Sequence, residues 1–197
     1  MQELVHHTIQ KIQELLEHFN KVQELYLSKS FDFDAQFEEF LYEFLDYLKT
    51  KGNTTYESEV LKVMNMISTV KRGFNPVQME KIASGKRELT WGFSFSAMES
   101  VHKFLMEMYT KEQKKLDEAE EILSGLIVSL YQNGILNDEI VKSLANVPKI
   151  EDFWNSLIKQ NTQIAGINKK LRLQMISEDI YLLLEKVLLK LNYSVII

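Results

Sequence analysis

Two Glu-x-x-His pairs are the residues in this chain best suited to chemistry, namely Glu3 with His6 and Glu99 with His102. A spacing of three residues puts both side chains of a pair on one helix face. Carboxylate-bridged metal centres in helical bundles use such pairs as ligands, so a metal-dependent oxidoreductase is one hypothesis. The pattern is short, and Glu3 and His6 belong to the polar face of their predicted helix. We therefore favour ordinary solvated side chains over metal ligands. We expect no metal or other cofactor.

Other catalytic signatures are missing from the 197 residues. The chain has no Cys, which excludes disulfides, thiolate zinc sites, iron–sulfur clusters and cysteine nucleophiles. It also has no Gly-x-Ser-x-Gly elbow, no Walker loop and no Gly-x-Gly-x-x-Gly fingerprint. We therefore expect a protein that is not an enzyme.

The segment 31–47 combines five Phe and two Tyr with six acids and no base. On a helix its apolar residues cover more than half of the surface, which indicates either burial among several helices or a groove-binding face for another protein. Both alternatives stay open from the sequence. An acidic rim around aromatic anchors would suit a basic protein partner. The residues expected to bind it are Phe37, Phe40, Phe44, Tyr47, Glu39 and Glu43.

The segment 71–88 has the opposite charge, with five bases and two acids in a chain whose net charge is −5. Trp91, Phe93 and Phe95 follow it, and bases beside aromatics could contact nucleic acid. The alternative function is therefore a small helical nucleic-acid-associated subunit. We favour a packed connector with solvated lysines, because the segment has little polar outer helix face. The bases are Lys71, Arg72, Lys81, Lys86 and Arg87.

Apolar residues recur at spacings of three and four along most of the chain, which predicts an all-α fold. We expect an elongated helical bundle with two long helices as its spine and shorter helices packed alongside. Gly73 to Phe95 forms the main irregular region, with a short helix that opens at Pro76. The other expected helices cover about 2–28, 34–52, 56–72, 96–133, 138–146 and 150–192.

The last of these segments carries Trp154, Asn161 and Asn168 at heptad spacing. Asn on an apolar seam can fix the register and partner number of a coiled coil, so a homo-oligomer is one outcome. The alternative is a chain that breaks between Asn161 and Gly166 into two helices.

The whole chain, 1–197, is expected to be one all-α domain, with a subdivision into 1–72 and 96–197 as the alternative. Its most apolar window, 180–197, is interrupted by Glu185, Lys186 and Lys190, so we expect no membrane span. No signal peptide is visible and a cytoplasmic location is expected. The favoured function is a non-enzymatic protein–protein interaction module, such as an adaptor, scaffold subunit, chaperone or immunity-type inhibitor.

Overall fold

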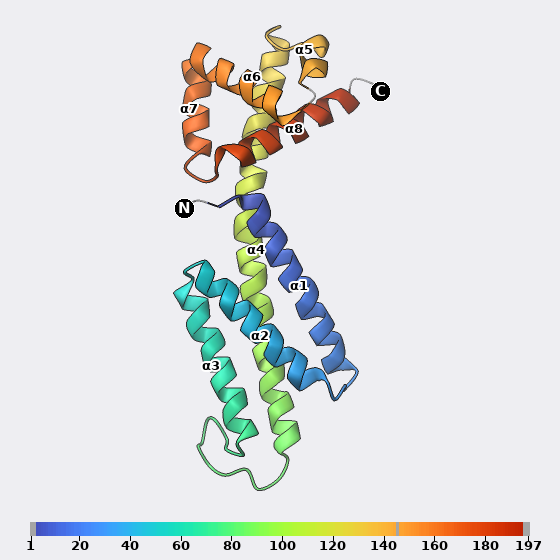
Figure 1. Cartoon of the computed structure of the whole chain (residues 1–197), viewed down its shortest axis with the longest axis vertical. Helices are drawn as coiled ribbons and strands as arrows, with labels where there is room; N and C mark the ends of the chain where they lie inside the picture. The colour runs from blue at the N-terminus through green and yellow to red at the C-terminus, as the bar shows by residue number, and fades with distance from the viewer. Residues whose placement is uncertain (1–2, 145, 195–197) are drawn as a thin grey trace. The chain divides into compact units, whose positions relative to one another are not determined.

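The computed structural model describes residues 3–144 and 146–194 (Figure 1). These residues form eight helices and no β-strand, which confirms the all-α class. The helices are α1 (Val5–Leu27), α2 (Phe33–Thr50), α3 (Thr54–Lys71), α4 (Lys86–Gln132), α5 (Asp138–Ser143), α6 (Val147–Gln160), α7 (Thr162–Leu171) and α8 (Ser177–Ser194). Among them α4, with 47 residues, is the single long helix, about 70 Å at the usual rise per residue.

The chain divides into two compact units, and α1 and α4 each contribute residues to both. We call Lys11–Tyr109 the α2–α3 unit, and Met1–Gln10 with Thr110–Ile197 the α5–α8 unit. These boundaries differ from the expected subdivision into 1–72 and 96–197. The single domain over 1–197 stays a prediction.

In the α2–α3 unit, one apolar core is built from buried side chains of α1, α2, α3 and α4. Residues three and four apart share a helix face, so the apolar residues of each of the four helices form one stripe that faces the core. The α2 stripe is the most aromatic, and its Phe33, Phe37, Phe40 and Phe44 are all buried. Asn53 caps α3, since its side chain accepts a hydrogen bond from the Tyr56 amide at 3.3 Å.

The connection between α3 and α4 differs from the expected irregular region. α4 begins at Lys86, ten residues before the predicted start at Ser96, so only 72–85 is non-helical. Pro76 lies in a turn instead of a short helix, and the Asn75 side chain accepts hydrogen bonds from the amides of Val77 and Gln78 at 2.9 and 3.2 Å. A helix cannot continue there because Met79 has a left-handed backbone, with φ of 59°.

The expected second long helix over 150–192 is divided into α6, α7 and α8. The first break falls at Asn161, whose backbone is extended and whose side chain accepts hydrogen bonds from the amides of Gln163 and Ile164. A side chain that satisfies the free amides of a new helix stabilises a break there. Buried apolar residues of α6, α7 and α8, including Trp154, form the core of this unit.

None of the helices among the described residues is long and apolar enough to cross a membrane. Most of the apolar window at 180–197 forms α8, in which Ile180, Leu184 and Leu188 are buried. Its last residues, 195–197, lie outside the described part of the chain.

Candidate functional site

The rings expected to bind a partner, Phe37, Phe40 and Phe44, lie in the core of the α2–α3 unit with at most 2% of their surface exposed. The Phe40 ring meets Phe19 of α1 edge-on, with centroids 5.6 Å apart. Side chains of α1, α3 and α4 belong to the same core and pack with these rings. The structure therefore places these three side chains in the core, and Phe37 also lines a groove between α2 and α3.

The remaining residues of that predicted site lie at or near the surface of α2. Tyr47 is half-buried, with the Lys51 ammonium 5.5 Å from its ring centre. Glu39 is exposed and accepts a hydrogen bond from Gln36 at 3.2 Å. Glu43 is exposed and lies 2.6 Å from Nδ1 of His18 on α1. The acidic side of α2 is thus a surface feature, although its aromatic side is not.

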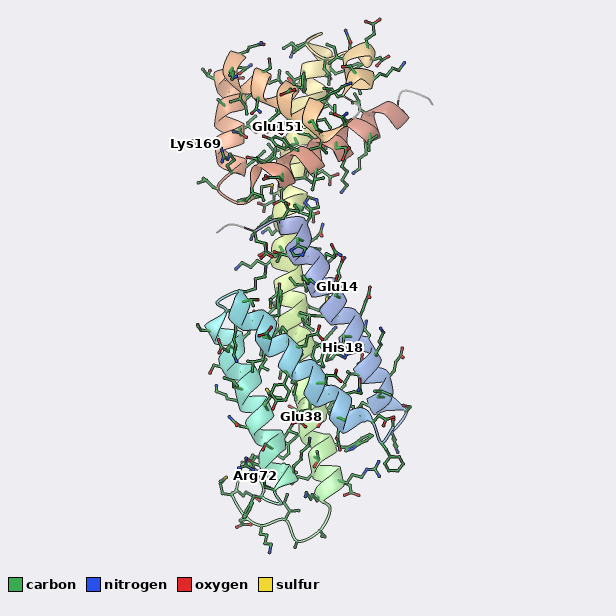
Figure 2. The ribbon with its side chains drawn as sticks, in the orientation of Figure 1. Glu14, His18, Glu38, Arg72, Glu151 and Lys169 are labelled. Atoms are coloured by element: carbon green, nitrogen blue, oxygen red, sulfur yellow. The ribbon has the colours of Figure 1, made fainter. Side chains whose placement is uncertain are left out.

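A groove of about 300 Å³ lies between α2 and α3, and we call it the acidic groove. Its floor is apolar, and Tyr42 and Leu61, on opposite helices, are 57% and 39% exposed. The Lys71 ammonium lies 2.5 Å from the Glu38 carboxylate, which links α3 to α2 (Figure 2 labels Glu38). The lining residues are Asp34, Phe37, Glu38, Leu41, Tyr42, Leu45, Leu61, Met64, Asn65, Ile67, Ser68, Lys71 and Ser94.

The charge of α2 makes this groove acidic. Between Phe33 and Thr50 the helix has five acids and one base, Lys49. Asp34 and Glu38 line the groove itself, and Lys71 is its single basic lining residue. The lining therefore has a net charge of −1, and the other three acids of α2 lie outside it.

A second groove, of about 490 Å³, lies between α3 and α4. It has an apolar lining that includes Val63, Met66 and Phe93, and Gly92 adds no side chain to it. Of its charged residues, Glu59 and Lys62 pair at 2.5 Å. With Glu88 as its third charged residue, this α3–α4 groove has two acids and one base in its lining, as the acidic groove does. The two grooves differ in the helix beside them, because α2 has five acids and one base whereas α3 has two acids and two bases.

The five bases of the predicted nucleic-acid site lie at the end of α3, in the loop after it and at the start of α4, and all are exposed. Figure 2 labels Arg72 at the loop end of α3. The Arg87 guanidinium lies 4.9 Å from the ring centre of Phe31 and 5.5 Å from that of Trp91. Lys71 is bound to Glu38, which leaves Arg72, Lys81, Lys86 and Arg87 as the basic surface of this end.

The residues expected to set a coiled-coil register have other roles. A seam through Trp154, Asn161 and Asn168 needs one continuous helix, and the break at Asn161 removes it. Trp154 is buried and its indole N–H donates to the side-chain oxygen of Asn168 at 3.0 Å. Asn161 caps α7. Both Asn side chains are thus satisfied within the chain.

The four His side chains contact separate partners. Nδ1 of His6 lies 2.7 Å from Asp179, and Nδ1 of His7 lies 3.1 Å from Glu3. The His102 ring stacks on Phe19, with ring centroids 5.5 Å apart. Within 3–144 and 146–194 no three His, Asp or Glu side chains converge as metal ligands would.

Asp179 is a polar site that the sequence did not suggest. It is fully buried at the start of α8 and accepts hydrogen bonds from the amides of Val5 and His6, at 2.9 and 3.2 Å, and from the His6 ring. Burial by itself would raise the pKa of Asp179, but the hydrogen bonds from His6 and Val5 outweigh burial and hold the pKa below its ordinary value. This carboxylate thus caps the N-terminus of α1.

Two further ionisable groups are perturbed by their neighbours. The Tyr56 hydroxyl donates to Glu107 at 2.6 Å, and this bond, aided by burial, raises the pKa of Tyr56 to about 12. Hydrogen bonds from Lys186 and Lys190 lower the pKa of Glu120. Each group belongs to a pair or triad that links helices within one unit, which is a structural role.

Comparisons of the chain with protein-family models, with curated proteins and with solved structures found no match. Its function is therefore inferred from its own geometry and chemistry.

Proposed function

We propose that the chain is a protein–protein interaction module that binds an amphipathic helix with a basic polar face in its acidic groove. The observation that supports this most is the combination, in one groove of about 300 Å³, of an apolar floor with the acid-rich helix α2. The proposal keeps the basic protein partner expected from the sequence but moves its site from buried rings to the α2–α3 rim.

The groove has the features that helix-binding grooves share. A partner helix presents apolar residues at spacings of three and four, and a shallow apolar floor between two helices can take them. Tyr42 and Leu61, both exposed, flank that floor from the two sides. Aromatic side chains often dominate binding energy, because they bury a large area at low entropic cost.

Charge decides which helices bind. The acids of α2 attract a basic polar face and repel an acidic one, and this discrimination acts mainly on the association rate and on specificity. Binding, and not catalysis, is the proposed activity, with adaptor, scaffold subunit, chaperone and immunity-type inhibitor as the roles it could fill. A cytoplasmic location and a homo-oligomer remain separate predictions from the sequence.

Two synthetic helices test the proposal. Each has about 18 residues, enough for five turns, with the same Leu face and with either Lys or Glu on the polar face. Fluorescence anisotropy measures the affinity of the fluorescently labelled peptides for the full chain. We expect the Lys peptide to bind at least about tenfold more tightly than the Glu peptide, with the difference shrinking as salt is added.

The variant Tyr42→Ser/Leu61→Ser removes the exposed apolar rim and should weaken the Lys peptide by about tenfold or more, equal to about 1.4 kcal/mol. Met66→Ser in the α3–α4 groove is the matched control and should leave the affinity unchanged. Equal affinity for the two peptides, or a loss caused by Met66→Ser and not by the rim variant, would contradict the proposed site.

A further inference from the structure

The end of the α2–α3 unit at which α4 begins exposes several large apolar side chains. Leu27 and Phe31, around the turn between α1 and α2, are 71% and 87% exposed. Val77 and Met79, in the loop between α3 and α4, are 73% and 69% exposed. We call these four residues the apolar tip. Several exposed side chains of this size at one end of a unit indicate a surface that something else covers.

The turn and the loop lie at the same end of the unit (Figure 1). The turn contacts the first residues of α4, because the Arg87 guanidinium lies 4.9 Å from the Phe31 ring, and α4 begins directly after the loop. The loop itself is folded, with an antiparallel bridge between Phe74 and Lys81. The apolar tip is thus carried on a folded end of the bundle.

Met79 has a backbone that does not suit its side chain. Its φ of 59° is left-handed, a conformation that favours Gly and Asn. Burial does not compensate for this cost, because most of the Met79 side chain faces solvent. Asn at this position would serve the fold better, so the apolar side chain is better explained by a contact outside the fold.

The charge of this end is opposite to that of α2. The segments 27–32 and 72–88 together have five bases and three acids, in a chain with a net charge of −5. The bases are Lys29, Arg72, Lys81, Lys86 and Arg87. Lys71 is left out of this count because Glu38 neutralises it.

We propose that this end docks on the surface of an anionic lipid bilayer, with the apolar tip in the interfacial region and the bases against lipid phosphates. A bilayer surface satisfies both kinds of side chain at once, because acyl chains take the apolar residues and headgroups pair with cations. A nucleic acid would pair with Lys81 and Lys86 but would leave aliphatic Val77 and Met79 exposed. The lipid surface therefore accounts for more of the exposed residues.

Vesicle co-sedimentation of the full chain tests this docking. The probes are vesicles of phosphatidylcholine alone and of phosphatidylcholine mixed with phosphatidylglycerol. We expect binding to the mixed vesicles that weakens with salt, and much weaker binding to phosphatidylcholine alone. Val77→Ser/Met79→Asn should reduce that binding by about tenfold or more, and Lys81→Glu/Lys86→Glu should do the same.

Thermal unfolding shows whether a loss of vesicle binding comes from misfolding. The melting temperature of Val77→Ser/Met79→Asn should be unchanged or higher, because both positions are exposed and Asn suits a left-handed backbone. Leu173→Ser/Lys142→Glu, which changes an exposed Leu and an exposed Lys of the α5–α8 unit, is the matched control and should bind vesicles as the unchanged chain does.

Three results would overturn the proposal. One is no binding to the anionic vesicles at low salt, and another is binding that survives Val77→Ser/Met79→Asn. The third is binding of a short RNA or DNA duplex that Lys81→Glu/Lys86→Glu abolishes, with no binding to vesicles, which would assign this end to nucleic acid.

Discussion

Replacing Asp179 with Asn perturbs the most buried polar contact of the α5–α8 unit while keeping the size of the side chain. The carboxylate accepts hydrogen bonds at 2.9 Å from the Val5 amide, at 3.2 Å from the His6 amide and at 2.7 Å from the His6 ring. Asn offers one acceptor oxygen, and its amide group would face a donor. At least one buried donor therefore loses its partner, which costs about 1–3 kcal/mol of unfolding free energy.

The pH dependence of that cost follows from the lowered pKa of Asp179. A carboxyl whose folded-state pKa lies below its ordinary value of 3.8 stabilises the fold fully above that value. The contribution is lost as the pH falls through the lower, folded-state pKa. The difference between the unchanged chain and Asp179→Asn should therefore be full at about pH 5.5 and clearly smaller at about pH 3.

Urea unfolding followed by tryptophan fluorescence measures this difference. The chain has two Trp, and a Trp91→Phe background leaves Trp154 as a reporter inside the α5–α8 unit. Glu178→Gln, at the neighbouring exposed position, is the control and should cost less than about 0.5 kcal/mol. A cost for Asp179→Asn that is absent at pH 5.5, or equally large at both pH values, would refute the role given to this carboxylate.

Further predictions concern the core, a cap and an ionisable pair. Phe40→Ala should cost about 3–5 kcal/mol of unfolding free energy in urea because it empties a core site, whereas Tyr42→Ser should cost under about 0.5 kcal/mol; similar costs for both would contradict their assigned burial. Asn161→Ala should lose about 1–2 kcal/mol in the same assay, and a neutral result would rule out its capping role. In a spectrophotometric titration one phenol should ionise at about pH 12, and Glu107→Gln should lower that pKa toward the usual tyrosine value. An unchanged titration would show that Tyr56 does not donate to Glu107.

The periodicity of the sequence was sufficient to predict most helices, because burial on one face leaves a local signature. The helix at 33–50 is an example, since its Phe residues follow the three-and-four spacing and the structure buries them. Whether those rings form core or interface was not predictable, because the number of helices that pack on α2 depends on segments elsewhere in the chain. The break at Asn161 was only one of two alternatives, since heptad spacing continues through a residue that can also cap a new helix.

The candidate sites depend on contacts between distant segments, which a single sequence does not reveal. Tyr42 and Leu61 line the same groove only because α2 and α3 pack together. Asp179 and His6 are 173 residues apart, and the one local signal was a pair of acids, Glu178 and Asp179, in the first turn of α8. The basic end was visible as a charged segment, but the exposure of its apolar residues became evident only in the structure.

The most direct test of the proposed function is to locate the bound Lys peptide by methyl NMR of the full chain. Leu41, Leu45, Leu61 and Met64 line the acidic groove, whereas Met66 lines the α3–α4 groove and not the acidic groove. We predict that the peptide shifts the methyl signals of the first four residues and leaves Met66 unchanged. Shifts that centre on Met66, or on methyl groups of the α5–α8 unit, would contradict the acidic groove as the binding site.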